Sequence, residues 1–563
     1  MRLRLSLPTL LALALAACSG SDTKGPATTT AAAAGENGGT LVLASGGDAD
    51  IIFPPLVSTA TGRQVVDQLF DHLAEIGNDL NTVGDVGFQP RLAKSWSWGK
   101  DSLSLAFSLD DRARWHDGKP VRAEDVKFTF DVNHDPKTGS NIAPLITSID
   151  SVTVRDSLTP VFWFKRRSPE LFYDAVYQMH ILPAHIFASI PREGLRTADA
   201  SRKPVGTGRF RFVSWEPNTR IEVVADTANF RGRARLDRVI WSMVPDPQAG
   251  LTQVLAGQAD FWEAVPADAI ARVDSSTTAH AVPYPGLQYA FLGFNLRNKA
   301  HDGPHPLFGD RAVRRALSMA VDRKGMLTNV FGSLGQPAFG PFPRSLSVAD
   351  TTLKLPAYDT TAARTLLDSA GWKVGADGMR AKNGRALAFS ILVPNSSRPR
   401  MSYAVLLQEQ LRKVGAKVDI DALQFSQFFA KQEAHDFDTI LNAYGTDPSP
   451  AGARQAWGSE GLAKGGQNYL SYSSKPFDAA LDSVLSALTP AERASRAHRA
   501  FQLIADDAPA IWLYDVLTVA AAHKRVKTAG LRADLYWANL ADWSIPAAAR
   551  IDRDRIGVAA AKR

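Results

Sequence analysis

The chain has 563 residues, far more than one hydrophobic core usually holds, so we expect two or three folded units. Apolar residues make up 45% and charged residues 21%, which excludes a disordered or collagen-like chain. The formal net charge of +7 is small for this length and does not by itself indicate a nucleic-acid-binding protein. The single cysteine, Cys18, excludes a disulfide scaffold, a CxxC redox site and a cysteine-rich metal site within one chain.

The N-terminus has the layout of a secretory signal peptide, predicted over residues 1–17. Arg2 and Arg4 precede an almost purely apolar run over residues 5–15, which is too short to span a membrane. The run ends in the sequence LAAC, which resembles the bacterial lipobox. That resemblance implies that Cys18 is lipidated and becomes the mature N-terminus. The alternative is a simple secretory signal in which Cys18 is incidental.

A flexible tether is predicted to follow the lipidated cysteine, over residues 18–39. This segment is rich in Ser, Thr, Ala and Gly and has no apolar period. A lipid and a tether would hold the protein on a membrane face while leaving it free to reorient. Folding is expected to start near Thr40, and no later apolar run approaches the roughly 20 residues of a membrane helix.

The first half of the folded part reads as strands, one helix and a turn. Apolar spacing and alternation predict a buried strand over 41–45, a helix over 63–76, a half-buried strand over 102–109, a turn over 115–120 and a hairpin over 152–165.

The second half alternates helices and strands. Asp310 and Asp359 are each placed to cap a helix, and Gly371 is placed to end the second. A β-α-β unit follows, with strands at 389–393 and 418–422 and a helix that ends near Gly415. Two further helices, over 476–487 and 491–506, precede a strand over 510–514. We therefore expect an α/β protein.

Catalytic motifs are scarce. The sequence contains no HExxH, no phosphate-binding GxxxxGK[ST], no GxSxG and no GxGxxG that opens a helix. The histidines are scattered, and prolines prevent His301 and His305 from sharing a regular helix, so no metal site is predicted. Since sequence cannot pair carboxylates across a cleft, a glycosidase stays open as an alternative. We expect a protein that is not an enzyme and needs no cofactor.

Arginine clusters and loop tryptophans are candidate binding features. The arginines near 231–238 and those at 311–315 favour solvated faces over a nucleic-acid patch. Several tryptophans lie in segments that read as loops, where they either plug a lobe or line a ligand cleft. These are Trp215, Trp262, Trp457, Trp537 and Trp543.

A series of motifs then occurs in a fixed order along the chain. They lie at 92–118, 123–128, 206–215, 251–260, 291–297, 312–323, 357–372, 468–482 and 507–514. Together they resemble the family 5 extracellular solute-binding proteins, the group that binds oligopeptides, dipeptides and nickel. The resemblance covers residues 40 to about 530 and specifies the fold better than the ligand.

This resemblance implies the type II periplasmic-binding-protein fold, with two lobes, a hinge and an additional domain. Lobe I is expected to be discontinuous, over 40–73, 190–292 and 515–563. The additional domain is expected at 74–189 and lobe II at 293–514. The hinge would lie near Gly293 and Asp515, and ligand held between the lobes would stabilise the closed form.

The resemblance also implies ligand-binding residues. In peptide-binding relatives, an aspartate in a W-x-x-D-Y-x-D-P stretch pairs with the amino terminus of the peptide, and Asp447 occupies the matching position. A proline follows Asp447 here, one residue is missing and the second acid is absent, so a plain turn residue is the alternative reading. Other segments that face the cleft in this family supply Asp48, Asp50, Asn295, Tyr444, Trp457, Asn468 and Tyr469.

The expected function is that of a lipid-anchored substrate-binding protein, which captures peptides and delivers them to the permease and ATPase of an ABC transporter. The protein is expected to be exported, monomeric and free of nucleic acid. One alternative keeps the fold but changes the ligand to a nickel chelate, an oligosaccharide or another small solute. A second alternative is a surface receptor lipoprotein with no role in transport.

Overall fold

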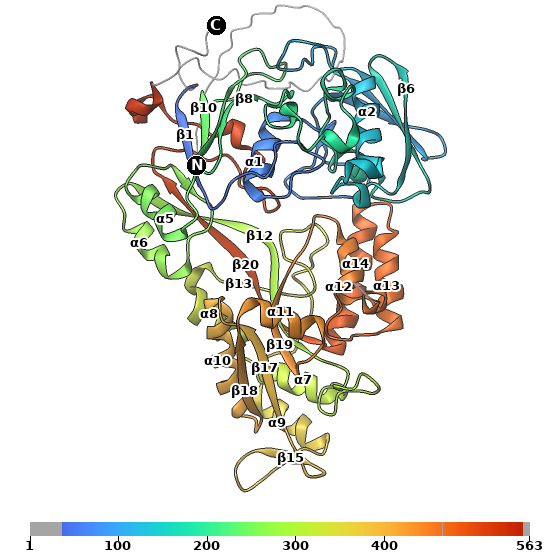
Figure 1. Cartoon of the computed structure of the whole chain (residues 1–563). Helices are drawn as coiled ribbons and strands as arrows, with labels where there is room; N and C mark the ends of the chain where they lie inside the picture. Colours follow the sequence, from blue (N-terminus) through green and yellow to red (C-terminus); the bar gives the residue numbers. More distant parts are fainter. Residues whose placement is uncertain (1–36, 464–465, 556–563) are drawn as a thin grey trace, which may run out of the picture.

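The computed structural model describes residues 37–463 and 466–555, which form the elongated molecule of Figure 1. The predicted signal peptide, Cys18 and most of the tether lie outside the described residues. The amide of Gly38 donates to the carbonyl of Arg235 at 2.7 Å, and the first strand starts at Thr40. Within the described ranges, no helix is long and apolar enough to cross a membrane.

One large mixed sheet runs through the molecule. Its strands, in spatial order, are β18 (Lys417–Leu423), β17 (Ala388–Pro394), β19 (Thr439–Gly445), β12 (Ala279–Phe294), β20 (Ala510–His523), β11 (Phe261–Trp262), β1 (Thr40–Ser45), β10 (Arg238–Met243), β9 (Arg220–Ala225) and β8 (Phe210–Glu216), with β13 (Gln336–Pro337) paired to β20. Strands from the predicted lobe II stand at one end of this order and strands from the predicted lobe I at the other.

The long strands β12 and β20 connect the two ends of the molecule (Figure 1). They pair antiparallel from Ala279 opposite His523 to Gly293 opposite Ala510. Both predicted hinge positions, Gly293 and Asp515, lie within this ladder. The ladder is interrupted between Pro285 and Tyr289, where the register of β12 shifts relative to β20.

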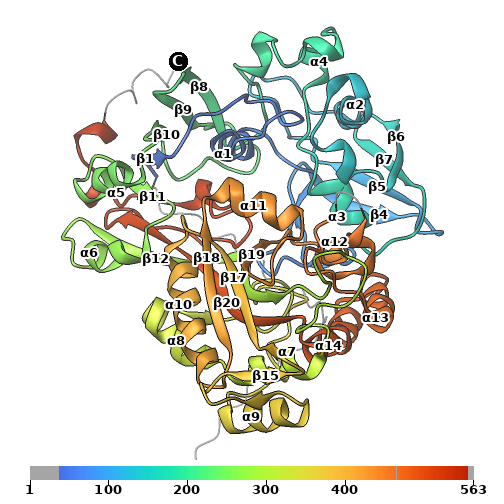
Figure 2. The same ribbon diagram turned by 60° about the horizontal axis from the view of Figure 1, so that its bottom comes forward.

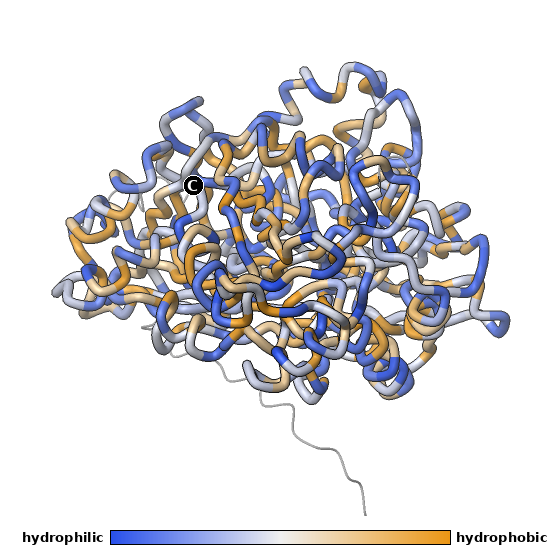
Figure 3. Tube along the Cα trace, turned by 90° about the horizontal axis from the view of Figure 1, so that it is seen from below, coloured by the Kyte–Doolittle hydropathy of each residue, from blue (hydrophilic) through white to orange (hydrophobic). Residues whose placement is uncertain are grey.

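Helices cover the sheet and fill its connections. They are α1 (Ala60–Leu69), α2 (Ala123–His134), α3 (Leu171–Val176), α4 (Ala184–Phe187), α5 (Pro247–Leu255), α6 (Ile270–Asp274), α7 (Arg311–Met319), α8 (Arg323–Phe331), α9 (Thr360–Ser369), α10 (Arg398–Arg412), α11 (Phe425–Glu433), α12 (Ala453–Trp457), α13 (Lys475–Leu485) and α14 (Pro490–Asp507). In Figure 3 hydrophobic segments run through the interior and hydrophilic segments lie at the outer turns.

A separate four-stranded sheet lies within the predicted additional domain. Its spatial order is β4 (Ala93–Trp98), β5 (Ser104–Leu109), β7 (Thr159–Phe164) and β6 (Ile149–Asp156). Three short pairings complete the strands: β2 (Ala74–Glu75) with β3 (Gln89–Pro90), and β15 (Arg380–Lys382) with both β14 (Lys373–Val374) and β16 (Arg385–Ala386). The exact domain boundaries stay a prediction.

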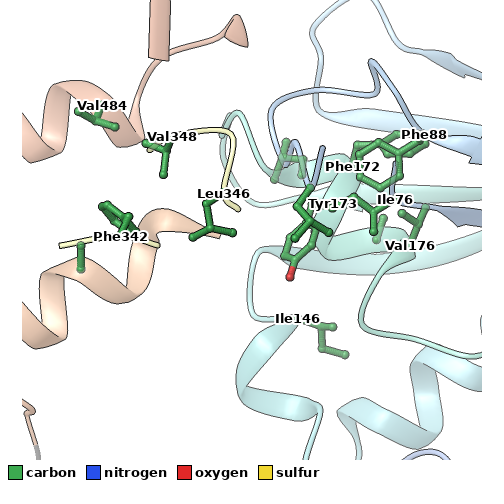
Figure 4. Close-up of a cluster of buried hydrophobic side chains, with 14 of the residues drawn as sticks. Ile76, Phe88, Ile146, Phe172, Tyr173, Val176, Phe342, Leu346, Val348 and Val484 are labelled. Atoms are coloured by element: carbon green, nitrogen blue, oxygen red, sulfur yellow. The ribbon is translucent and has the colours of Figure 1, made fainter. Parts of the chain in front are cut away.

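The additional domain and lobe II share one hydrophobic cluster. Figure 4 shows Ile146 and Tyr173 on the side of the additional domain, and Phe342 and Leu346 on the side of lobe II. All four side chains are buried and belong to one continuous group of apolar contacts. Lobe II therefore packs on the additional domain as well as joining lobe I through the long strands.

Most of the predicted elements are confirmed, including both aspartate caps. The Asp310 carboxylate accepts from the amide of Ala312 at 2.8 Å, and that of Asp359 from Ala362 at 2.8 Å. The β-α-β unit is also present, as β17, α10 and β18 with the two strands parallel. Local capping and apolar spacing decide these elements, which is why they could be read from the sequence.

Of the tryptophans predicted to lie in loops, Trp215, Trp262 and Trp457 lie instead in β8, β11 and α12. Three further predictions were wrong in part. The helix expected over 63–76 is α1, which starts earlier because the hydroxyl of Thr59 caps it and ends at Leu69. The strand expected over 510–514 continues to His523 in β20.

The third error concerns the arginines of α7. Arg314 is buried instead of solvated, and it donates to the carbonyls of Phe308, Asp507 and Ala508 at 2.7 to 3.2 Å. The carbonyl groups at the end of α14 lack helical partners, so they provide the acceptors that this guanidinium needs.

Candidate ligand-binding site

A cavity of about 840 Å³ lies where the predicted lobes and the additional domain meet. Its volume is within the range of known ligand pockets. Its wall comes from α1 and the residues before it, from 141–145 and 177–180 of the additional domain, from 284–288 of β12, from 445–448 after β19, from 516–518 of β20 and from 533–537.

The interruption of the β12–β20 ladder lies in the wall of this cavity. Gly286 and Leu287 lie in the wall, within the register shift between β12 and β20. A Cβ atom at position 286 would lie 2.6 Å from the carbonyl oxygen of Val516, so only glycine fits there. The carbonyl of Leu287 accepts from the amide of Thr446 at 2.8 Å, which fixes the start of the loop after β19.

Asp447 lies in the cavity wall, on that loop. Its side chain is exposed, and among the described residues its carboxylate has no hydrogen bond and no ion pair. It is the only residue of the predicted ligand-binding set that lines the cavity as the described residues form it. A carboxylate without a partner, at the edge of a ligand-sized cavity, is suited to a cationic group.

Three other predicted residues are buried and hold the chain in place. The indole of Trp457 donates to the hydroxyl of Tyr289 at 2.7 Å. The amide group of Asn468 donates to the carbonyls of Gly458 and Tyr472. The amide group of Asn295 donates to the carbonyls of His435 and Phe437, both at 3.0 Å.

The remaining predicted residues also make internal hydrogen bonds. Tyr444 donates to the carbonyl of Gln467, and Tyr469 to the carboxylate of Glu433. Asp48 accepts from the indole of Trp215 and from the amide of Asn218, and Asp50 accepts from Ser58 and Thr59. Tyr444 packs against Phe291 and Trp457, away from the loop that it precedes. A ligand-binding role for these residues stays a prediction.

The structure adds a chain of polar side chains that the sequence analysis missed. The indole of Trp537 donates to Asp67 at 2.5 Å, and the other carboxylate oxygen of Asp67 lies 2.9 Å from Nε2 of His180. The ring of His180 lies 3.9 Å from that of His72, between centroids. Burial is the main reason that the pKa of His180 is lowered, and His72 lowers it further. Only Trp537 carried a sequence signal, as a tryptophan in a loop.

Two more acids in the wall are already engaged. Glu263 accepts from the side-chain amide of Gln64 at 3.0 Å, and burial raises the pKa of Glu263. Asp534 accepts from the hydroxyl of Tyr177 at 2.9 Å and from Arg532 at 2.6 Å. Because these carboxylates have partners, Asp447 is the acid of the wall that is available to a ligand.

Arg63 is the cationic counterpart. It lies on the first turn of α1, its side chain is exposed in the wall, and among the described residues it has no side-chain hydrogen bond or ion pair. Within the same described ranges, no group of three or more His, Cys, Asp or Glu side chains is placed to hold a metal ion.

A family model, "Bacterial extracellular solute-binding proteins, family 5 Middle", matches residues 87–463, which is more than half of the chain. The chain belongs to this family. Among its relatives, the oligopeptide-binding protein AppA of Bacillus subtilis is 27% identical over 91% of this chain and 92% of that protein. The heme-binding protein A of Haemophilus influenzae is 25% identical over 92% of this chain and 94% of that protein.

Solved structures of this family share the fold. The structure of AppA from Bacillus subtilis in complex with a nonapeptide has a TM-score of 0.67 and 25% identity, and covers 91% of this chain and 99% of its own. The structure of NikZ from Campylobacter jejuni in complex with Ni(L-His) has a TM-score of 0.69 and 25% identity, and covers 90% and 99%. This family 5 protein therefore has the type II periplasmic-binding-protein fold.

Proposed function

We propose that this family 5 protein captures peptides in the cavity between its lobes and delivers them to the permease of an ABC transporter. The observation that carries the proposal is the unpaired carboxylate of Asp447 in a cavity of about 840 Å³. An ammonium group is the cation that a peptide with a free amino terminus offers. The AppA relative, whose structure holds a nonapeptide, supports this ligand class.

The charges of the wall suit a zwitterion. Asp447 and Arg63 are the two charged side chains of the wall that lack a partner among the described residues, and they have opposite signs. We assign Asp447 to the ammonium group of the ligand and Arg63 to a ligand carboxylate. A guanidinium binds a carboxylate through two parallel hydrogen bonds, which supports this assignment.

A metal chelate is the second candidate ligand. The rings of His72 and His180 stand next to each other in the wall, and the Nε2 atom of His72 is buried without a hydrogen-bond partner. Imidazole nitrogens bind transition metals, and a chelator would supply the remaining ligands. The NikZ relative, whose structure holds Ni(L-His), supports this alternative.

The location and partners belong to the same proposal. Lipidation of Cys18 would anchor the exported protein, and residues up to 39 would serve as a tether. The protein would act as a monomer and would meet a permease and an ATPase of the transporter.

Native mass spectrometry of the protein from residue 19 onward tests the proposal. Purified without denaturation, the protein is mixed with a pool of synthetic peptides of two to nine residues. Adducts that fragment as peptides are the expected result. Selective retention of Ni(L-His), with no peptide adduct, would replace the proposal by the chelate alternative.

A further inference from the structure

Glu170 joins three segments that are far apart in the sequence. It precedes α3 in the additional domain, and its side chain is 13% exposed. Its Oε1 atom accepts from the hydroxyl of Thr82 at 2.5 Å and from Nη1 of Arg493 at 2.9 Å. Its Oε2 atom accepts from the hydroxyl of Ser449 at 2.7 Å. Glu170 therefore links the additional domain both to α14 and to the loop that carries Asp447.

Arg493 depends on this carboxylate. Its side chain is only 4% exposed, and among the described residues Glu170 is its one ion-pair partner. Nε and Nη2 of the guanidinium are buried without a hydrogen-bond partner. A buried guanidinium is stable only where an acid compensates its charge. The pair therefore joins α14 of lobe II to the start of α3, and both helices contribute residues to the hydrophobic cluster that lobe II and the additional domain share.

The loop that carries Asp447 is fixed on both sides of this residue. On one side, the amide of Thr446 donates to the carbonyl of Leu287. On the other side, Ser449 binds Glu170, and proline residues stand directly before and after Ser449. Proline fixes its own φ and restricts the residue before it, so Pro448 limits the backbone of Asp447 between the two anchors.

We propose that Glu170 is a positioning residue. Through Ser449 it holds the loop that carries Asp447, and through Arg493 it holds α14, so the position of Asp447 depends on the contact between α14 and the start of α3. Asp447 then faces the ligand correctly only when lobe II lies on the additional domain. In this way ligand recognition and lobe closure depend on one carboxylate. The role of Asp447 in binding rests on the proposed function, whereas the restraint on the loop does not.

Amide hydrogen exchange of the ligand-free protein tests the restraint. Ser449→Ala removes one hydroxyl and leaves the Glu170–Arg493 pair intact. We expect the Thr446 amide to exchange about fivefold faster in this variant, since a lost hydrogen bond of ordinary strength corresponds to roughly that factor. Glu170→Gln should give the same or a larger increase. Unchanged exchange at Thr446 in both variants would overturn the proposal.

A second serine–carboxylate hydrogen bond, to Asp174 of α3, provides a matched control. Ser148 donates to the carboxylate of Asp174 at 2.6 Å, also a serine–carboxylate bond to α3, but it does not touch the Asp447 loop. Ser148→Ala should leave the exchange of Thr446 unchanged. An equal increase in the control would show a general loosening of α3 and would also overturn the proposal.

Peptide binding supplies a second readout that a merely structural role would not move. With the tightest peptide of the pool, Ser449→Ala should weaken binding about fivefold in the native protein, in line with one hydrogen bond. It should have no effect in the Asp447→Asn background, because the positioned carboxylate is then gone. An equal loss in both backgrounds contradicts the positioning role. Absence of any peptide binding refutes the proposed function, while the exchange experiment still decides the restraint.

Discussion

The two sides of the cavity differ in how their charges are arranged. On the side of α1 and residues 533–537, each carboxylate in the wall has a partner within the protein, such as Trp537 and His180 for Asp67 or Arg532 for Asp534. On the side of lobe II, the loop after β19 presents Asp447 without one. The carboxylates of the first side are thus held in place by the protein, and its unpaired charge is the cation of Arg63, whereas the second side presents an unpaired carboxylate to the ligand.

The largest expected effect comes from removing an ion-pair partner on the side of the cavity where the carboxylates are paired. Arg532 is 3% exposed and binds both Glu75 and Asp534, so Arg532→Met would leave Asp534 without an ion pair and Glu75 with only its longer contacts to Arg91 and His72. We expect a loss of about 3–5 kcal/mol in the free energy of unfolding, measured by chemical denaturation. Arg398 is the control, because its ion pair with Asp268 is exposed, and Arg398→Ala should cost less than about 1 kcal/mol. Equal losses of stability in the two variants would contradict the distinction between buried and exposed ion pairs.

Asp515, in strand β20, makes the free energy of unfolding depend on pH, by about 2 kcal/mol between pH 4 and pH 7. Burial raises the pKa of Asp515 to about 6, and one of its carboxylate oxygens has no partner among the described residues. In the unfolded chain the pKa is about 4, so the folded state binds the proton more tightly and stability falls as pH rises from about 4 to 6. Asp515→Asn removes this contribution. Denaturation of both proteins at pH 4 and pH 7 measures it, and parallel stabilities would contradict the assignment.

Neutralising the Asp447 carboxylate should weaken ligand binding without changing the stability of the fold. Asp447→Asn keeps the size of the side chain, and no hydrogen bond or ion pair of the described residues is lost. We expect peptide affinity to fall about 10- to 100-fold, or about 1.4–2.7 kcal/mol, by calorimetric titration. The melting temperature of the ligand-free protein should not change. A lower melting temperature with unchanged affinity would identify Asp447 as a turn residue.

Arg63 gives the smallest effect, because it is exposed and its interactions are screened by salt. Arg63→Met should weaken binding of a free-carboxylate peptide by less than about tenfold, corresponding to a surface charge pair of under about 1.4 kcal/mol. The loss should shrink at high salt and disappear for the same peptide with an amidated carboxyl terminus. An equal loss for the amidated peptide would exclude a charge interaction.

Local features of the fold could be predicted, whereas contacts between distant segments could not. The caps at Asp310 and Asp359 and the β-α-β unit depend on neighbouring residues, and they are confirmed. The buried position of Arg314 depends on carbonyls almost 200 residues away, at the end of α14, and no local pattern shows it. The helix expected over 63–76 joined two segments, because Leu73 and Ile76 supply a different hydrophobic cluster from that of α1.

The candidate site shows the same difference between local features and contacts of distant segments. Asp447 was reached through the family resemblance, since its spacing alone also fits a plain turn. His72, His180 and Asp67 come together only because α1 and the additional domain meet, so their separate positions in the sequence carry no signal. Glu170 was missed for the same reason, since its partners come from loop 82, the loop after β19 and α14.

The most direct test compares one peptide with a free and an acetylated amino terminus. The tightest binder of the peptide pool is titrated in both forms into the native protein and into Asp447→Asn. Our account predicts that acetylation weakens binding to the native protein at least about tenfold, since it removes the ammonium group that Asp447 binds, and has little effect on the variant. Equal affinities of the two forms for the native protein would contradict the central role of Asp447.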